Sequence, residues 1–213
     1  VYLSAGTKFL FDGQYHFNIY GTLKAIGTEP DSIIFDNFGE EKWQGFTLDN
    51  VSDETEFRYV RISGAEKTDT EGGGMYLDNS DPTLTHVNIS GNTAGITGGG
   101  MHLSNSNPIL TNVTISENTA SYPGGGMWLH YSNPTLTHVT ISGNTTSSSG
   151  GGMVLLTSNP ILTHVVISEN TAELSGGGLD FIASNPILTD VTISGNTAVE
   201  NFGGGMTISG GNP

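Results

Sequence analysis

The sequence predicts an all-β fold, a right-handed parallel β-helix (solenoid) of about eight coils built on a 26-residue repeat. Gly-Gly-Gly recurs at residues 72, 98, 124, 150, 176 and 203, which gives a period of 26 residues with one spacing of 27. No 3.6-residue apolar period occurs within a repeat. Each repeat instead contains short alternating runs rich in β-branched residues, separated by Gly, Pro and Asn.

One repeat is expected to form three short strands and three corners. In the first repeat, Met75 and Leu77 point inward and Tyr76 points outward, as alternation along a strand requires. The second run ends at Leu84, the third contains Val87 and Ile89, and turn signals stand at Asp81-Pro82, His86 and Gly91-Asn92. Such a unit cannot bury its apolar side alone, so successive copies must stack in parallel about 4.8 Å apart. Parallel crossovers are overwhelmingly right-handed.

Equivalent positions of successive coils are expected to form columns. The two interior columns are Leu84, Leu110, Leu136, Leu162 and Leu188, and Ile89, Ile115, Ile141, Ile167 and Ile193. A hydrogen-bonded amide ladder is predicted from Asn92, Asn118, Asn144, Asn170 and Asn196, and a second polar column from Ser80, Ser106, Ser132, Ser158 and Ser184. One corner carries only residue types enriched at positive φ, namely His86, Asn112, His138, His164 and Asp190.

Residues 1–71 are interpreted as degenerate N-terminal coils, and residues 72–213 as the regular repeats of one continuous solenoid. Phe57, Val60 and Ile62 align with Leu84, Val87 and Ile89 at an offset of 27, and Phe46-Thr-Leu48 stands where Met-x-Leu follows the glycines. Three earlier runs, 9–11, 17–19 and 33–35, are expected to be strands of two further coils. The whole rod should be roughly 40 Å long from the strand spacing.

Composition excludes several classes of function. The net charge is −15, and all six Lys and Arg residues precede residue 72, which argues against nucleic acid and anionic membranes as partners. There is no cysteine, and no apolar stretch long enough to span a membrane. The chain starts at Val1 without a leader, so we expect a mature protein or an excised domain. Calcium is compatible with the acidity but not required by it, and no cofactor is predicted.

Side chains that differ from coil to coil mark the candidate binding face. The column outward from the Gly-Gly-Gly-Met strand reads Tyr76, His102, Trp128, Val154, Asp180, and the next outward column contains His130, with Tyr131 beside it. Aromatic rings on a flat β surface suit stacking on sugar rings, so Tyr76, His102, Trp128, His130 and Tyr131 are the candidate carbohydrate-binding residues. The alternative is ordinary cross-strand packing of aromatic side chains.

Catalytic and metal-binding constellations are not predicted. A polysaccharide lyase needs a basic residue, for which Arg58 and Arg61 are the candidates, and we expect both to be solvated or paired with Glu54 or Glu56. A hydrolase needs two carboxylates about 5–9.5 Å apart, for which no motif is found. His138 and His164 occupy one column, which admits a two-His zinc site, but Asn112 and Asp190 at the same position favour a conformational role.

The repeats resemble a known class of bacterial proteins. Ile-Ser-x-Asn-Thr followed by Gly-Gly-Gly-Met is similar to the repeats of polymorphic outer-membrane proteins, within bacterial secreted right-handed parallel β-helix proteins. The segment from Ser4 to Phe35 resembles the opening coils of large secreted proteins from Bacteroidota-like organisms. The resemblance implies secretion and display at the bacterial cell surface. It implies no single activity, because the class includes lyases, hydrolases, adhesins and tail fibres.

The predicted function is therefore a non-catalytic extracellular structural or adhesive scaffold. The alternative is a carbohydrate-binding or polysaccharide-degrading β-helix. The sequence ends in mid-coil at Asn212-Pro213 after the apolar strand Met206-Thr-Ile208, while Val1-Tyr-Leu3 opens the other end as a strand. Because open strand edges template pairing, head-to-tail self-association into filaments is expected if this is the true extent of the chain.

Overall fold

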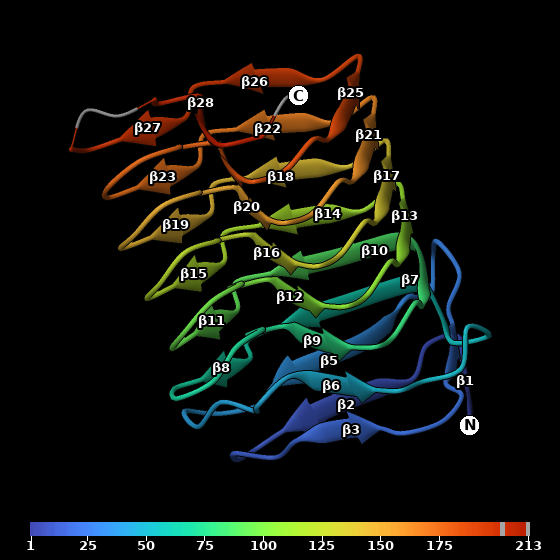
Figure 1. Cartoon of the computed structure of the whole chain (residues 1–213). Coiled ribbons are helices and arrows are strands. Elements are labelled where there is room, and N and C mark those ends of the chain that lie inside the picture. The colour runs from blue at the N-terminus through green and yellow to red at the C-terminus, as the bar shows by residue number, and fades with distance from the viewer. Residues whose placement is uncertain (201–202, 212–213) are drawn as a thin grey trace.

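The computed structural model, which describes residues 1–200 and 203–211, is a parallel β-solenoid of about eight turns. Successive coils stack along one axis, from the N-terminal coils at the bottom of Figure 1 to the C-terminal coils at the top. No helix long and apolar enough to cross a membrane occurs among the described residues. Asn212 and Pro213, on which the prediction of a mid-coil end depends, lie outside them.

The strands form three sheets that run along the solenoid axis, two of them from the N-terminal coils and the smallest from β8 onward. The eight-stranded sheet consists of β3 (Phe17–Ile19), β6 (Phe46–Asp49), β9 (Met75–Asp78), β12 (Met101–Ser104), β16 (Met127–His130), β20 (Met153–Leu156), β24 (Leu179–Ile182) and β28 (Met206–Ser209). The six-stranded sheet consists of β8 (Glu66–Lys67), β11 (Thr93–Ala94), β15 (Thr119–Ala120), β19 (Thr145–Thr146), β23 (Thr171–Ala172) and β27 (Thr197–Ala198).

The third sheet is the largest, with 14 strands. Its members are β1 (Tyr2–Ser4), β2 (Lys8–Phe11), β4 (Lys24–Ile26), β5 (Ile33–Asn37), β7 (Glu56–Ser63), β10 (Thr83–Ser90), β13 (Ile109–Thr111), β14 (Thr114–Ser116), β17 (Thr135–Thr137), β18 (Thr140–Ser142), β21 (Ile161–Thr163), β22 (Val166–Ser168), β25 (Ile187–Thr189) and β26 (Thr192–Ser194). It wraps around the predicted corner at His86, where φ is 53° and β10 continues through the bend as one strand.

The prediction of three strands per repeat misses one strand: the coils from β12 to β27 have four strands each, and the coil before them has three because β10 runs through the bend. The additional strand is the Thr-Ala or Thr-Thr pair after the Asn ladder, which pairs in parallel with its copy in the next coil, as Thr93 does with Thr119. Two residues are too short to show an alternating pattern in the sequence, so only stacking reveals them as a strand. Ala94, Ala120 and Ala172 in this sheet are fully buried.

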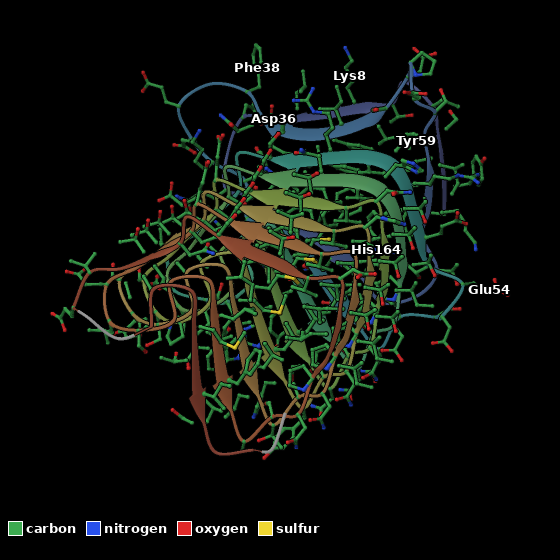
Figure 2. All side chains as sticks on the ribbon, turned by 90° about the horizontal axis from the view of Figure 1, so that it is seen from above. Lys8, Asp36, Phe38, Glu54, Tyr59 and His164 are labelled. Atoms are coloured by element: carbon green, nitrogen blue, oxygen red, sulfur yellow. The ribbon has the colours of Figure 1, made fainter. Side chains whose placement is uncertain are left out.

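The predicted columns are confirmed by the strand register. Leu84 pairs with Leu110, and Ile89 pairs with Ile115, each 26 residues further along the chain. The interior side chains from Leu84 to Leu162 and from Ile89 to Ile167 are buried. Leu188 is an exception at 37% exposed, because no further coil among the described residues packs on it. Viewed along the axis, side chains fill the interior, and the centre is a core rather than a channel (Figure 2).

The N-terminal coils continue the same register with larger side chains. β7 pairs with β10 from Phe57 opposite Leu84 to Ile62 opposite Ile89, and β6 pairs with β9 through Phe46 opposite Met75, as predicted. Aromatic rings fill this end of the core: Phe35 stacks on Phe9 at 4.9 Å between ring centroids and meets Phe46 edge-on at 4.7 Å. Edge-to-face and offset contacts of this kind add to the stabilisation that burial provides.

Both predicted polar ladders are present and buried. From Asn92 to Asn170, each Asn side chain accepts from a backbone N–H of the coil below and donates to the Asn above, as Asn144 Oδ1 accepts from Asn118 N at 3.0 Å; the last member, Asn196, is half-buried. The Ser hydroxyls accept equivalent bonds, such as Ser106 N to Ser132 Oγ at 3.0 Å. A third ladder, which the sequence analysis missed, is exposed and lies beside the prolines; its members are Asp81, Asn107, Asn133, Asn159 and Asn185.

The Gly triplets serve two different purposes. The first glycine takes a positive φ, as Gly98 does at 67°. The third has no room for a side chain: a Cβ on Gly100 would lie 2.7 Å from Gly126 O, 2.8 Å from Ile115 Cγ2 and 2.9 Å from Asn118 Nδ2. Close stacking of bare backbone between the core and the Asn ladder therefore requires Gly at this position.

Candidate functional site

The outward column of the Gly-Gly-Gly-Met strands contains three of the five predicted binding residues. Tyr76, His102 and Trp128 lie opposite one another on β9, β12 and β16. The ring centroids of Tyr76 and His102 are 5.1 Å apart, and those of His102 and Trp128 are 6.5 Å apart. These three side chains form an aromatic row that runs parallel to the solenoid axis.

The prediction that this column is open to solvent is wrong for three of its members. His102, Val154 and Asp180 are buried, whereas Tyr76 and Trp128 are half-buried. The segments between the two-residue strands and the glycines, residues 95–97, 121–123, 147–149 and 173–175, fold back beside the column, and we call them the arms. Thr97 on the first of these approaches His102, with Oγ1 2.7 Å from Nδ1. The arms hydrogen-bond to one another, as Tyr122 N does to Ile96 O at 2.9 Å.

Burial determines the protonation of His102. Removal from water, together with the smaller effects of the charges on His130 and Lys67, lowers its pKa to about 3. The imidazole is therefore neutral near pH 7 and takes part in one hydrogen-bonded contact with Thr97. It is part of the packing between arm and sheet.

The other two predicted residues form a separate surface pair. His130 and Tyr131 have ring centroids 4.3 Å apart, and Tyr131 is exposed at a corner where its φ is 49°. His130 belongs to β16 and faces the same side as Trp128, two residues before it. The structure therefore brings Tyr76, His102 and Trp128 together in one row and leaves Tyr131 on the rim.

A recess of about 320 Å³ lies at the N-terminal end of the aromatic row. It is lined by His16, Thr47, Lys67, Thr70, Glu71 and Tyr76. Thr70 and Glu71 belong to residues 68–71, the segment equivalent to the arms in the preceding coil. Thr47 comes from β6 in the coil below, where it lies opposite Tyr76. The volume is at the lower end of the range for small-molecule sites.

Lys67 is a buried cation beneath this recess and was not predicted as a functional residue. It lies opposite Ala94 in the next coil, and its Nζ donates to Phe46 O at 3.1 Å and to Thr47 Oγ1 at 3.4 Å. Nζ is also 5.8 Å from the centroid of the Tyr76 ring. A lysine where four of the five other coils have alanine was the one signal in the sequence that pointed to it.

The recess is electrostatically mixed. Burial lowers the pKa of Lys67 to about 8, and the Glu71 carboxylate opposes this shift. Burial also raises the pKa of Tyr76, and the carboxylates of Asp78, Glu71 and Asp49 raise it further. The recess therefore combines the Lys67 ammonium, the neutral phenol of Tyr76 and the Glu71 carboxyl group, with Asp49 and Asp78 acting on Tyr76 from outside the lining.

A second line of polar side chains follows the positive-φ corner of the 14-stranded sheet. The rings of Tyr59 and His86 stack at 4.6 Å, and those of His138 and His164 stack at 4.8 Å. His164 Nδ1 lies 3.4 Å from Asp190 Oδ2. Tyr59 and His164 lie on the same side of the solenoid in Figure 2. The conformational prediction for this corner is confirmed, since φ is between 52° and 54° at all five predicted residues.

No group of three or more metal-ligating side chains occurs among the described residues, at this corner or elsewhere. The two arginines weighed as a catalytic base are both exposed, on either side of the bend at Tyr59, where φ is 50°. Arg58 Nε lies 3.8 Å from Glu56 Oε1, which is one of the partners predicted for it.

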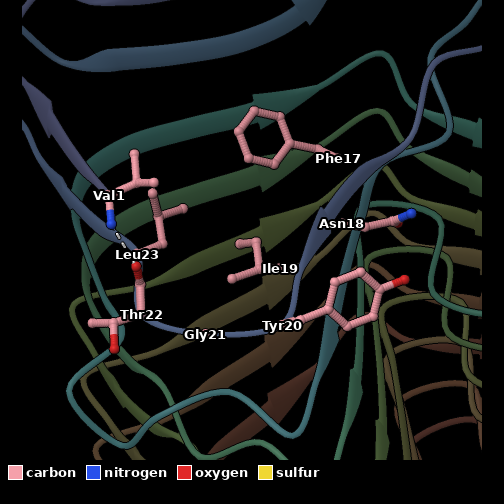
Figure 3. Close-up of a pocket in the computed structure, with 8 residues that line it drawn as sticks. All are labelled: Val1, Phe17, Asn18, Ile19, Tyr20, Gly21, Thr22 and Leu23. Carbon is pink, nitrogen blue, oxygen red and sulfur yellow. Dashed lines mark hydrogen bonds between the residues drawn. The ribbon is translucent and has the colours of Figure 1, made fainter.

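A larger recess, of about 380 Å³, opens at the first coil and has a different character. Its lining includes the apolar side chains of Val1, Phe17, Ile19 and Leu23 (Figure 3). The terminal ammonium of Val1 donates to Thr22 O at 2.8 Å. Because Phe17, Ile19 and Leu23 belong to or pack against the hydrophobic core, this recess is the face of the core at the first coil rather than an assembly of recognition groups.

Comparison with known proteins identifies the architecture. A model of the family described as "Right handed beta helix region" matches residues 33–213. This match confirms the predicted right-handed parallel β-helix. No curated protein and no solved structure matches the chain.

Proposed function

The chain belongs to the right-handed beta helix family, and from that premise we propose that it is a non-catalytic structural scaffold displayed outside a bacterial cell. The observation that carries the proposal is the continuous stack of columns. Apolar residues, the Asn ladder and the Ser ladder extend from coil to coil, and no buried side-chain N or O atom among the described residues lacks a hydrogen-bond partner. A core satisfied in this way holds a rigid shape along its whole length.

The charge distribution supports a role at an exterior surface. The net charge of −15 keeps rods apart and soluble, while the repeated coils present the same outward positions at regular intervals. The resemblance of the repeats to those of polymorphic outer-membrane proteins supports the proposal of secretion and surface display. An adhesive scaffold would use the outward columns for contact and the ladders for stiffness.

The competing function is degradation of a polysaccharide. Lys67 is the basic side chain next to the recess, but it is only 3% exposed and donates to Phe46 O and Thr47 Oγ1. A general base must come within hydrogen-bond reach of the substrate proton. This burial favours a positioning role for Lys67 over proton abstraction.

The test combines an activity assay with limited proteolysis. The protein is incubated with polyuronates and neutral polysaccharides, and unsaturated products and new reducing ends are measured. The scaffold proposal predicts no turnover, together with resistance of residues 72–200 to protease, since their backbone is paired in the stack. Turnover of any polysaccharide, or rapid cleavage within the coils, would overturn the proposal.

A further inference from the structure

We propose that the recess beside Tyr76 binds a single neutral pyranose ring of a polysaccharide, which stacks on the Tyr76 ring and hydrogen-bonds to the Glu71 carboxylate. This inference goes beyond the scaffold function and does not depend on it. A scaffold that binds no sugar remains a scaffold, and a sugar site could exist on a protein with another role.

The shape of the recess fits one sugar ring. Its volume of about 320 Å³ is sufficient for a monosaccharide unit but not for an enclosed oligosaccharide. Tyr76 is half-buried, its ring centroid is 5.1 Å from that of His102, and the Lys67 ammonium lies 5.8 Å from its centroid. The ring is therefore held in place before a ligand arrives, which reduces the entropy lost on binding.

The polar groups around the ring match the hydroxyl groups of a sugar. Glu71 accepts hydrogen bonds, Thr47 and Thr70 both donate and accept, and His16 supplies ring nitrogens. The slightly positive C–H groups of a pyranose face are attracted to the negative face of an aromatic ring. Lys67 acts as a positioning residue, because its contacts to Thr47 and to the Tyr76 ring fix two walls of the recess.

The charges favour a neutral ligand over an acidic one. Glu71, Asp78 and Asp49 all lie close enough to Tyr76 to raise its pKa. A uronate carboxylate stacked on this ring would meet the same three carboxylates. The Lys67 ammonium offsets this repulsion only in part, because Glu71 already interacts with it.

Isothermal titration of the whole chain tests the proposal with defined probes. The neutral probes are β-linked gluco-, manno- and galacto-oligosaccharides, and the acidic probe is oligogalacturonate. The test variant is Tyr76→Val, since valine occupies the same column at Val154 and should be tolerated. The matched control is Tyr122→Val, on an arm and 59% exposed. Circular dichroism and thermal melting confirm that both variants are folded.

We expect at least one neutral oligosaccharide to bind the unmodified protein and the Tyr122→Val variant with equal affinity. Loss of the stacking ring in Tyr76→Val should weaken that binding by about tenfold or more, and Tyr76→Phe should restore it. Three results would overturn the proposal: no binding of any neutral probe, neutral binding that Tyr76→Val leaves unchanged, or a preference for oligogalacturonate.

Discussion

Replacing Asn144 by alanine should destabilise the protein far more than replacing Asn133, although both belong to Asn ladders. Asn144 is fully buried in the middle of the stack. Its Oδ1 accepts from Asn118 N and Asn118 Nδ2, each at 3.0 Å, and its Nδ2 donates to Ile115 O at 3.0 Å and to Asn170 Oδ1 at 2.9 Å. The amide thus connects three successive coils.

The magnitude follows from the groups that lose their partners. Asn144→Ala leaves the buried Asn118 N–H unpaired and removes one partner each from Asn118 Nδ2 and Ile115 O, while Asn170 Oδ1 keeps its bond from Asn144 N at 3.0 Å. At about 1–3 kcal/mol for a buried unsatisfied group and less for a partly satisfied one, the loss should be about 3–5 kcal/mol. Asn133 is exposed and accepts only from Asn159 N at 2.6 Å, so water can replace it and the loss should stay below about 1 kcal/mol.

Urea unfolding followed by circular dichroism measures both variants. Trp43 and Trp128 lie in different coils, so coincidence of the fluorescence and circular dichroism transitions checks whether the stack unfolds as one unit. Asn144→Asp is a useful companion, because it preserves the shape but removes the amide donor and buries a charge, and it should be at least as destabilising as Asn144→Ala. Equal midpoints for Asn144→Ala and Asn133→Ala would refute the argument that burial makes this ladder important.

Four further predictions concern the core, the glycines, and the buried side chains of Lys67 and His102. Ile141→Asn should lower the free energy of unfolding by several kcal/mol, roughly 3–5, because a polar amide in a fully buried column cannot be fully paired, and an unchanged melting temperature would contradict this. Gly100→Ala should prevent folding or strongly lower the melting temperature, because the added Cβ would clash with its neighbours. At Gly143, φ is 64° and no atom lies closer than 3.7 Å to an added Cβ, so Gly143→Ala should lower the free energy of unfolding, measured in urea, by only about 1–2 kcal/mol through backbone strain. The pKa of Lys67 is lowered to about 8, so the folded state disfavours the ammonium, and the free energy of unfolding should rise between about pH 8 and pH 10 by at most about 3 kcal/mol. Urea titrations at each pH measure this dependence, and Lys67→Met should remove it. The pKa of His102, lowered to about 3, likewise means that stability falls as pH drops from about 6.5 towards 3, and His102→Val should make the melting temperature less sensitive to acid over that range.

The repeat by itself determined the architecture, because identical spacing places identical residues in register. The interior columns, the Asn and Ser ladders and the positive-φ corner at His86 all follow from one alignment on the glycines, because each repeats at equivalent positions of neighbouring coils. The degenerate coils could be aligned for the same reason, as Phe57 opposite Leu84 shows.

The tertiary structure alone decided which outward side chains are accessible. His102 lies at an outward position of an alternating strand, yet Thr97 and its arm cover it, because the chain folds back after a two-residue strand that has no sequence periodicity. The recess at Tyr76 likewise depends on where segments of different coils end: Thr47 and His16 belong to coils below, and Glu71 to the segment beside it. Columns arise where equivalent residues of successive coils repeat. A recess arises where the repeat is interrupted, and its shape depends on packing between non-equivalent residues, which the repeat does not specify.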